Sequence, residues 1–157
     1  MKRTAFILLA GLLVYSCNQH PTANMASAQV KQPVVVADTI RDGLFIHIMD
    51  GYNDPHKVLM ALKMANLMAA DKDVLVYMDI HAVELLVKGA KDMHFADFDS
   101  FQSYIKQLVD KKVGVYACPT CLKIAGFKPE DLMEGVQVAQ KDKFFSFTRG
   151  RILSLDY

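Results

Sequence analysis

Several features that would fix a class of protein are missing from this 157-residue sequence. Its longest apolar run, Thr4 to Tyr15, has twelve residues, which is too short for a transmembrane helix of about 20 residues. No internal repeat and no low-complexity tract is visible. With 18 basic and 17 acidic residues, the chain lacks the basic excess of nucleic-acid-binding domains. With 52% apolar residues, the sequence predicts one compact domain and no nucleic-acid partner.

The N-terminus has the pattern of an export signal, because Lys2 and Arg3 precede the apolar run. Ser16 and Cys17 close that run, and a small residue before a cysteine there resembles the lipobox of bacterial lipoproteins. The resemblance implies that residues 1–16 are a signal peptide and that Cys17 becomes a lipidated N-terminus. Several acyl chains would anchor the protein durably to a membrane. An ordinary secretory signal cleaved elsewhere is the alternative.

This signal predicts an extracytoplasmic protein, anchored on the periplasmic side of a bacterial membrane. Loss of residues 1–16 removes two basic residues and no acidic one, leaving 16 basic against 17 acidic residues. Residues 17–40 are predicted to form the lipidated N-terminus and a tether, since small and polar residues dominate the stretch from 18 to 33. The run from Pro33 to Ala37 is either an edge strand or ordered tether. The folded domain is predicted to span residues 41–157.

Within that domain, strands and helices alternate. Apolar β-favouring runs predict strands at 44–49, 73–78 and 112–117, with shorter ones in 135–139 and 151–155. Helical spacing predicts helices at 55–70, 82–89 and 100–110, the first capped by Asp54 ahead of Pro55. A short helix is expected after Cys118 and another helical turn at 129–133. Strands joined by helices form parallel crossovers, so the fold class is α/β, doubly wound, with a mostly parallel sheet of about five strands and helices on both faces.

Two of the three cysteines, Cys118 and Cys121, follow a predicted strand, at the sheet edge where ligands and chemistry collect in such folds. With Pro119 at the first helical position, Cys118 is the predicted helix cap, where free N–H groups favour a thiolate. A structural zinc site would need a second Cys or His pair, and none is present. A thioredoxin-like redox pair fits the spacing but would open a long helix earlier in the chain. A third interpretation is a pair of buried thiols that only pack.

Four stretches in order resemble the DsrE/DsrF-like family: DGYNDPHKVLMALKMANLM, VLVYMDIHAVELLVKG, GVYACPTCLKIAG and EDLMEGVQV. The resemblance runs from about Leu44 to Leu155. It implies a sulfur relay in which a loop cysteine carries sulfur as a persulfide, in assemblies of three or six subunits. The matching loop position is Cys118, and Cys121 is the second cysteine of the Cys-x-x-Cys variant.

The resulting hypothesis is a membrane-tethered protein in which Cys118 carries sulfur or exchanges thiols and Cys121 resolves the product. In an oxidising compartment the resting state is predicted to be a disulfide between them. The predicted partners are further copies of the chain and a sulfur or thiol donor or acceptor protein. No cofactor and no metal is predicted, and the sequence leaves open whether the chain is an enzyme. The alternative is a non-enzymatic binding or accessory module for a partner protein or a metal.

Other polar residues follow the predicted strands. Asp50, Asp79 and His81 could gather near the cysteines as auxiliary groups, or could be turn, cap and solvated residues. His47, inside an apolar strand, is predicted to be a hydrogen-bonded core residue, and His94 lies in a long loop. A stripe of methionines could bind copper but favours core packing: Met60, Met64, Met68. Aromatic residues near the C-terminus predict contacts in the core or between subunits: Phe144, Phe145, Phe147.

Overall fold

A computed structural model describes residues 39–157, all within a compact unit that spans Ala37–Tyr157. The predicted signal peptide, the lipidated Cys17, the tether up to residue 38 and the undecided 33–37 run lie outside the described residues. Among the residues described, no helix is long and apolar enough to cross a membrane.

The centre of the domain is a five-stranded sheet in the order β4-β3-β2-β1-β5. All four strand pairs are parallel, which confirms the predicted α/β fold class. The strands are β1 Gly43–Ile48, β2 Asp73–Met78, β3 Gly114–Ala117, β4 Val136–Val138 and β5 Ile152–Asp156.

Helices connect the strands much as predicted. They are α1 Pro55–Met68, η1 Ala82–Leu86, α2 Phe101–Asp110, α3 Pro119–Ile124, η2 Pro129–Asp131 and α4 Lys143–Ser146, where η marks a 3₁₀ helix. The Asp54 side chain accepts a hydrogen bond from the Lys57 N–H and caps α1, with Pro55 in its first turn. Ser100 caps α2 in the same way through the Ser103 N–H.

The helix expected at 82–89 is wrong in type and length, because η1 is a five-residue 3₁₀ helix. Val87 turns to extended backbone at φ −94° and ψ 151° and bridges to Leu132. This pairing ends the helix before its second turn. The strand expected from residue 112 begins at Gly114, since Lys112 takes a left-handed φ of +64° at the end of α2.

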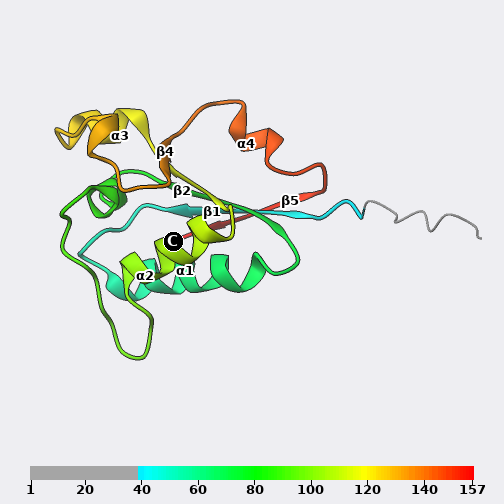
Figure 1. Ribbon diagram of the computed structural model, residues 1–157, viewed down its shortest axis with the longest axis horizontal. Helices are drawn as coiled ribbons and strands as arrows, with labels where there is room; N and C mark the ends of the chain where they lie inside the picture. Colours follow the sequence, from blue (N-terminus) through cyan, green and yellow to red (C-terminus); the bar gives the residue numbers. More distant parts are fainter. Residues whose placement is uncertain (1–38) are drawn as a thin grey trace, which may run out of the picture. The chain divides into compact units, whose positions relative to one another are not determined.

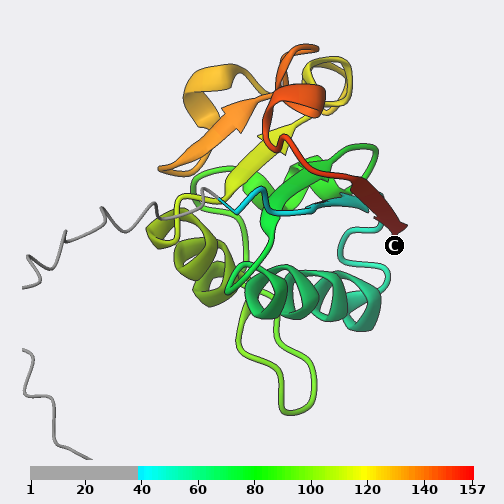
Figure 2. The same ribbon diagram turned by 90° about the vertical axis from the view of Figure 1, so that its right-hand side faces the viewer.

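The two faces of the sheet are covered unequally. Figures 1 and 2 show α1 and α2 side by side against one face, and the short α3 and α4 on the other side. Leu44, Ile46 and Ile48 of β1 alternate toward the α1 and α2 face and are almost completely buried, each contributing about 1.5–3 kcal/mol to stability. Phe45 and His47 point to the opposite face and are only half-buried.

The loops after β1 and β2 are held together at the carboxyl edge of the sheet. The N–H of His81 donates to the Met49 carbonyl at 3.2 Å, and the N–H of Asp79 donates to that of Ile48 at 3.1 Å. Gly51 is required for this approach, because a Cβ there would lie 2.8 Å from the His81 carbonyl oxygen. The packing fixes the backbone beside the cysteine loop.

Candidate functional site

The cysteine loop leaves the carboxyl end of β3. The N–H of Cys118 continues the sheet by donating to the Met78 carbonyl at 2.9 Å, and its own carbonyl accepts the Leu122 N–H at 2.9 Å. Cys118 is thus the cap residue of α3, with Pro119 in the first turn, as predicted from the sequence. Both Cys118 and Cys121 are free thiols of intermediate exposure, and the predicted disulfide stays a prediction.

The surroundings of Cys118 favour its thiolate form. Burial opposes ionisation, but the Tyr77 hydroxyl and the N–H groups of Cys121 and Thr120 outweigh it, so the pKa of Cys118 lies below that of an ordinary thiol. These N–H groups stabilise the negative charge of the Cys118 thiolate, although the Cys118 side chain makes no regular capping hydrogen bond to α3. Cys118 is therefore the more acidic thiol of the pair and the better nucleophile near neutral pH.

The pKa of Cys121 is displaced in the opposite direction, above that of an ordinary thiol. Burial raises its pKa, and the side chain and charge of Cys118, followed by the charge of Asp79, raise it further. The Ile80 N–H, which faces the sulfur, only partly offsets these effects. Cys121 is therefore the less acidic thiol of the pair.

Tyr77 of β2 is a site residue that was not predicted from the sequence. Burial raises the pKa of Tyr77, and its contact with Cys118 and the nearby charges of Cys118 and Asp79 raise it further. The hydroxyl therefore keeps its proton and can donate it as a hydrogen bond to the Cys118 sulfur. The ring is fixed by Phe144 of α4, whose centroid lies 5.1 Å away in an edge-to-face contact, and by His47 at 5.4 Å.

His47 joins two carboxylates at the same end of the sheet. Its Nε2 lies 3.0 Å from Asp79 Oδ1, and its Nδ1 lies 3.1 Å from Asp156 Oδ1 in β5. The prediction of a hydrogen-bonded histidine agrees with this geometry, but the side chain is about one-fifth exposed and borders the site. Only the contact between Nδ1 and Asp156 has the geometry of a hydrogen bond, because Nε2 and Asp79 Oδ1 are close but unsatisfied. Asp79 lies close enough to Tyr77 and Cys121 for its charge to raise the pKa of both groups.

The backbone between these groups is strained. Ile80 has a φ of +46°, a left-handed conformation that a β-branched residue seldom adopts. Such a residue costs of order 1–3 kcal/mol, and strain of this kind clusters at functional sites. Here it directs the Ile80 N–H at Cys121 while half of the Ile80 side chain remains exposed.

Of the three predicted auxiliary residues, the structure brings only Asp79 to the cysteines. The carboxylate of Asp50 accepts from Lys57 at 2.9 Å and Asn53 at 2.7 Å, which lowers its pKa and makes it a turn residue. His81 is 68% exposed and lies 3.7 Å from Glu84.

The remaining candidates lie elsewhere. His94 is exposed in its loop, 3.6 Å from Asp92. Met64 and Met68 pack against the core as predicted, whereas Met60 is exposed. Among residues 39–157, no group of three or more His, Cys, Asp or Glu side chains is arranged to hold a metal ion.

Tyr77 and His47 were missed because each stands within an apolar strand and looks like core. A signal for them exists in the alternation of β1 and β2, where both residues fall on the face opposite the buried aliphatic residues Leu44, Ile46 and Ile48 of β1. They are also register partners. Two polar aromatic residues on one face, each near a carboxyl end, indicate a site rather than a core.

Comparison with known proteins identifies the family of this chain. The sequence profile described as "DsrE/DsrF-like family" matches residues 43–147. No curated protein matches the chain. Two solved structures share the fold. The ychN protein from E. coli has 18% identity and a TM-score of 0.59, over 73% of this chain and 99% of that one. A protein of unknown function from Methanobacterium thermoautotrophicum, MTH1491, has 20% identity and a TM-score of 0.54, over 72% and 98%. Because the family match spans more than half of the sequence, the chain belongs to the DsrE/DsrF-like family.

Proposed function

We propose that this protein carries sulfur as a persulfide on Cys118, with Cys121 as the thiol that resolves the loaded state. The observation that carries the proposal is the opposite displacement of the two pKa values, below the ordinary value for Cys118 and above it for Cys121. A carrier needs one ready nucleophile and benefits from a second thiol that does not react at once.

Loading is a thiol exchange without net oxidation. The Cys118 thiolate attacks the outer sulfur of a persulfide donor, R–S–SH. A new S–S bond forms on Cys118, the donor's S–S bond breaks, and the donor leaves as the thiolate RS⁻. Tyr77 stabilises the attacking thiolate before the reaction, so its hydroxyl acts as a positioning group for the nucleophile.

Resolution uses the second thiol. Cys121 attacks the Cys118 sulfur, the outer sulfur leaves as hydrogen sulfide, and a disulfide joins the two cysteines. The two electrons that reduce the sulfane sulfur come from the two thiols. Because burial and the charge of Asp79 raise the pKa of Cys121, we expect this step to be slow, so that an acceptor can take the sulfur first. The same pair supports thiol–disulfide exchange with a partner.

The experiment measures sulfide release after glutathione persulfide is added to the reduced full chain, with Cys17 replaced by Ser in the reference protein, called wild type here, and in every variant. Wild type is expected to release one equivalent of sulfide slowly and to form the internal disulfide. Cys121→Ser should load sulfur without releasing it, and Cys118→Ser should do neither. Release that persists in Cys118→Ser would refute the assignment, and preferential loading of Cys121 would reverse the two roles.

A protein acceptor fits the surface around the loop. Ile80 is 51% exposed and Ile124, three residues after Cys121, is 80% exposed. Apolar side chains beside a reactive thiol offer contact area to a docking protein. Substitution of both by Ser should leave alkylation of Cys118 unchanged and slow sulfur transfer to a protein acceptor.

Anchoring through a lipid on Cys17 and a position outside the cytoplasm belong to the same proposal. Support comes from the apolar run that ends in Ser16 and Cys17. Cys17→Ser should move the protein from the membrane fraction to the soluble fraction. Unchanged retention would contradict the lipid anchor.

Assembly into trimers or hexamers is also proposed. Its support is the family membership together with large exposed apolar side chains on β5 and α4, namely Ile152, Leu153 and Phe145. Sedimentation of Cys17→Ser protein should give the mass of three or six chains. A monomer at micromolar concentration would contradict it.

A further inference from the structure

Two buried polar atoms beside the cysteine site lack a hydrogen bond. His47 Nε2 and Asp79 Oδ1 lie 3.0 Å apart, and neither makes a hydrogen bond to any residue from 39 to 157. Buried polar groups without hydrogen bonds lower stability and are rare in native proteins, and a catalytic role is one reason for their presence.

The other ring nitrogen of His47 determines what Nε2 can do. Nδ1 forms a hydrogen bond with Asp156 Oδ1 at 3.1 Å, and since an ionised carboxylate only accepts, Nδ1 carries the hydrogen. In the neutral imidazole Nε2 is then an acceptor, and it faces a carboxylate oxygen of Asp79 that also accepts. One added proton would join these two acceptors, because the broad terminal torsion of an aspartate lets its carboxylate turn into line.

The surroundings of His47 suit a ring that gains and loses a proton. The titratable side chains that face it are Asp79, directly after β2, Asp156, its register partner on β5, and Tyr77, whose ring centroid is 5.4 Å away. An imidazolium would therefore have a carboxylate at each nitrogen. The Asp156 side chain is 61% exposed, which gives the proton a route to water.

The backbone connects Asp79 to the cysteine loop. The Cys118 N–H donates to the Met78 carbonyl at 2.9 Å, and Asp79 is the next residue. The Ile80 N–H, in the peptide unit that joins Asp79 to Ile80, faces the Cys121 sulfur. The charge of Asp79 also contributes to the raised pKa of Cys121. Asp79 thus links Cys121 to His47.

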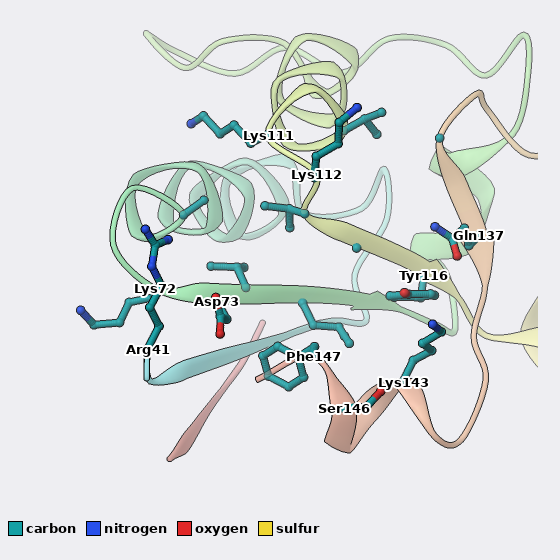
Figure 3. Close-up of a pocket in the computed structure, with 17 residues that line it drawn as sticks. Arg41, Lys72, Asp73, Lys111, Lys112, Tyr116, Gln137, Lys143, Ser146 and Phe147 are labelled. Atoms are coloured by element: carbon teal, nitrogen blue, oxygen red, sulfur yellow. The ribbon is translucent and has the colours of Figure 1, made fainter. Parts of the chain in front are cut away.

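The space between His47 and Asp79 fits a proton and no larger ligand, because both facing atoms are buried. Figure 3 shows a separate cavity of about 610 Å³, lined by residues that include Asp73 and Gly114 at the amino ends of β2 and β3. Neither His47 nor Asp79 is among the lining residues that the structure describes.

Resolution needs an acceptor for the Cys121 proton, since a thiol attacks another sulfur as its thiolate. An ordinary carboxylate is a poor acceptor, because its pKa of about 3.9 lies far below the value of about 8.5 for a thiol. An ordinary imidazole has a pKa of about 6.5, so it takes the same proton roughly 400-fold more readily. A histidine behind Asp79 therefore supplies the basicity that the carboxylate lacks.

We propose that the His47–Asp79 pair takes up the proton that leaves Cys121 during resolution, with Asp156 orienting the imidazole. The inference rests on the proposed function, because resolution is the step that it serves. The Cys121 sulfur forms a bond to the Cys118 sulfur, and the bond from Cys118 to its outer group breaks. The outer group leaves with the electron pair, and the proton stays on the pair until it passes to water.

The test loads Cys118 without a persulfide. Reduced full chain, with Cys17 replaced by Ser in the reference protein and in every variant, is mixed with an equimolar amount of dithiobis(nitrobenzoate). Attack by Cys118 releases one thionitrobenzoate anion, and attack by Cys121 on the mixed disulfide releases a second, both followed by absorbance. The second release does not involve sulfane sulfur. A failure of persulfide loading would therefore refute the sulfur carrier and leave this test intact.

His47→Gln keeps a polar side chain but removes the base. The second release should slow about tenfold at neutral pH, less than the 10²–10⁴-fold typical of general bases, because Cys121 is partly exposed and also loses its proton to water. In the reference protein the rate should be constant with pH between the titrations of the pair and of Cys121. In His47→Gln it should instead rise about tenfold per pH unit over that range, whereas the first release, by Cys118, should be unchanged.

Asp156→Asn tests the same link at an exposed side chain, where the change leaves the core intact. It should slow the second release about two- to fivefold, as expected for one exposed ion pair. In the His47→Gln background it should have no further effect, because Asp156 acts through the imidazole. An additional slowing in that background would remove the orienting role given to Asp156.

The matched control is His81→Gln, which removes an imidazole two residues after Asp79. That ring is 68% exposed and lies 3.7 Å from Glu84, so both releases should match the reference protein. An unchanged rate and pH profile in His47→Gln would overturn the proposal. An equal loss in His81→Gln, or an equal slowing of both releases in His47→Gln, would overturn it as well.

Discussion

Replacing Tyr77 by Phe isolates the contribution of one hydroxyl to the reactivity of Cys118. The change removes the hydroxyl that lowers the pKa of Cys118 but keeps the ring that packs against Phe144, 5.1 Å away, and Phe45, 6.2 Å away. Burial then opposes ionisation with only the N–H groups of the cysteine loop against it. The pKa of Cys118 should rise.

The size of the effect follows from the kind of bond that is lost. A hydrogen bond to a charged group contributes about 1.5–3 kcal/mol, and at the lower value the thiolate population below its pKa falls about tenfold. The remaining thiolate is more nucleophilic, by about threefold for a change of this size. Alkylation of Cys118 at neutral pH should therefore slow about threefold.

The assay follows the rate of iodoacetamide labelling against pH in a chain whose other two cysteines are replaced by Ser. The midpoint of the rate profile should move to higher pH in Tyr77→Phe. Tyr116→Phe is the matched control, since Tyr116 is the register partner of Tyr77 on β3 and its ring lies against Gly114 at the start of that strand. An unchanged midpoint in Tyr77→Phe, or an equal shift in Tyr116→Phe, would refute the assigned role.

Three further predictions concern stability. Asp54→Ala should lower the free energy of unfolding by about 1 kcal/mol, because it removes the cap of α1, and urea denaturation measures it. Gly51→Ala should cost about 1–3 kcal/mol in the same assay, since its Cβ would press on the His81 carbonyl. Hydrogen bonds from Arg151 hold the pKa of Asp42 below its ordinary value. Its stabilisation is therefore present above about pH 4 and is lost as pH falls through the lowered value. The free energy of unfolding should fall less with decreasing pH in Asp42→Asn than in wild type. An equal fall in both proteins would contradict the contribution of the Asp42–Arg151 ion pair.

The elements of the fold could be predicted because local chemistry specifies them. Asp54 before Pro55 gave the start of α1, and the apolar run at 73–78 gave β2 with its observed bounds. The short η1 could not be predicted, since its end depends on the bridge between Val87 and Leu132. These residues are distant in sequence, and helical spacing carries no information about such a pairing.

The candidate site likewise has one part that the local sequence predicts and another that depends on how the strands pair. Cys118 at a helix cap followed from the sequence, because Pro119 marks the first turn of α3. Tyr77 and His47 belong to neighbouring strands, and only the parallel register of β1 and β2 brings them beside each other and the cysteine loop. The placement of β5 next to β1, which brings Asp156 to His47, likewise depends on the order of strands in the sheet.

Sulfur loading of Cys118 tests the central claim most directly. Reduced Cys121→Ser chain, with Cys17 also replaced by Ser in every variant, is exposed to glutathione persulfide, and its intact mass and digested peptides are measured. The account predicts a gain of one sulfur atom, located on the peptide that contains Cys118 and absent from the Cys118→Ser, Cys121→Ser double variant. No gain in mass, or a gain that survives in the double variant, would contradict it.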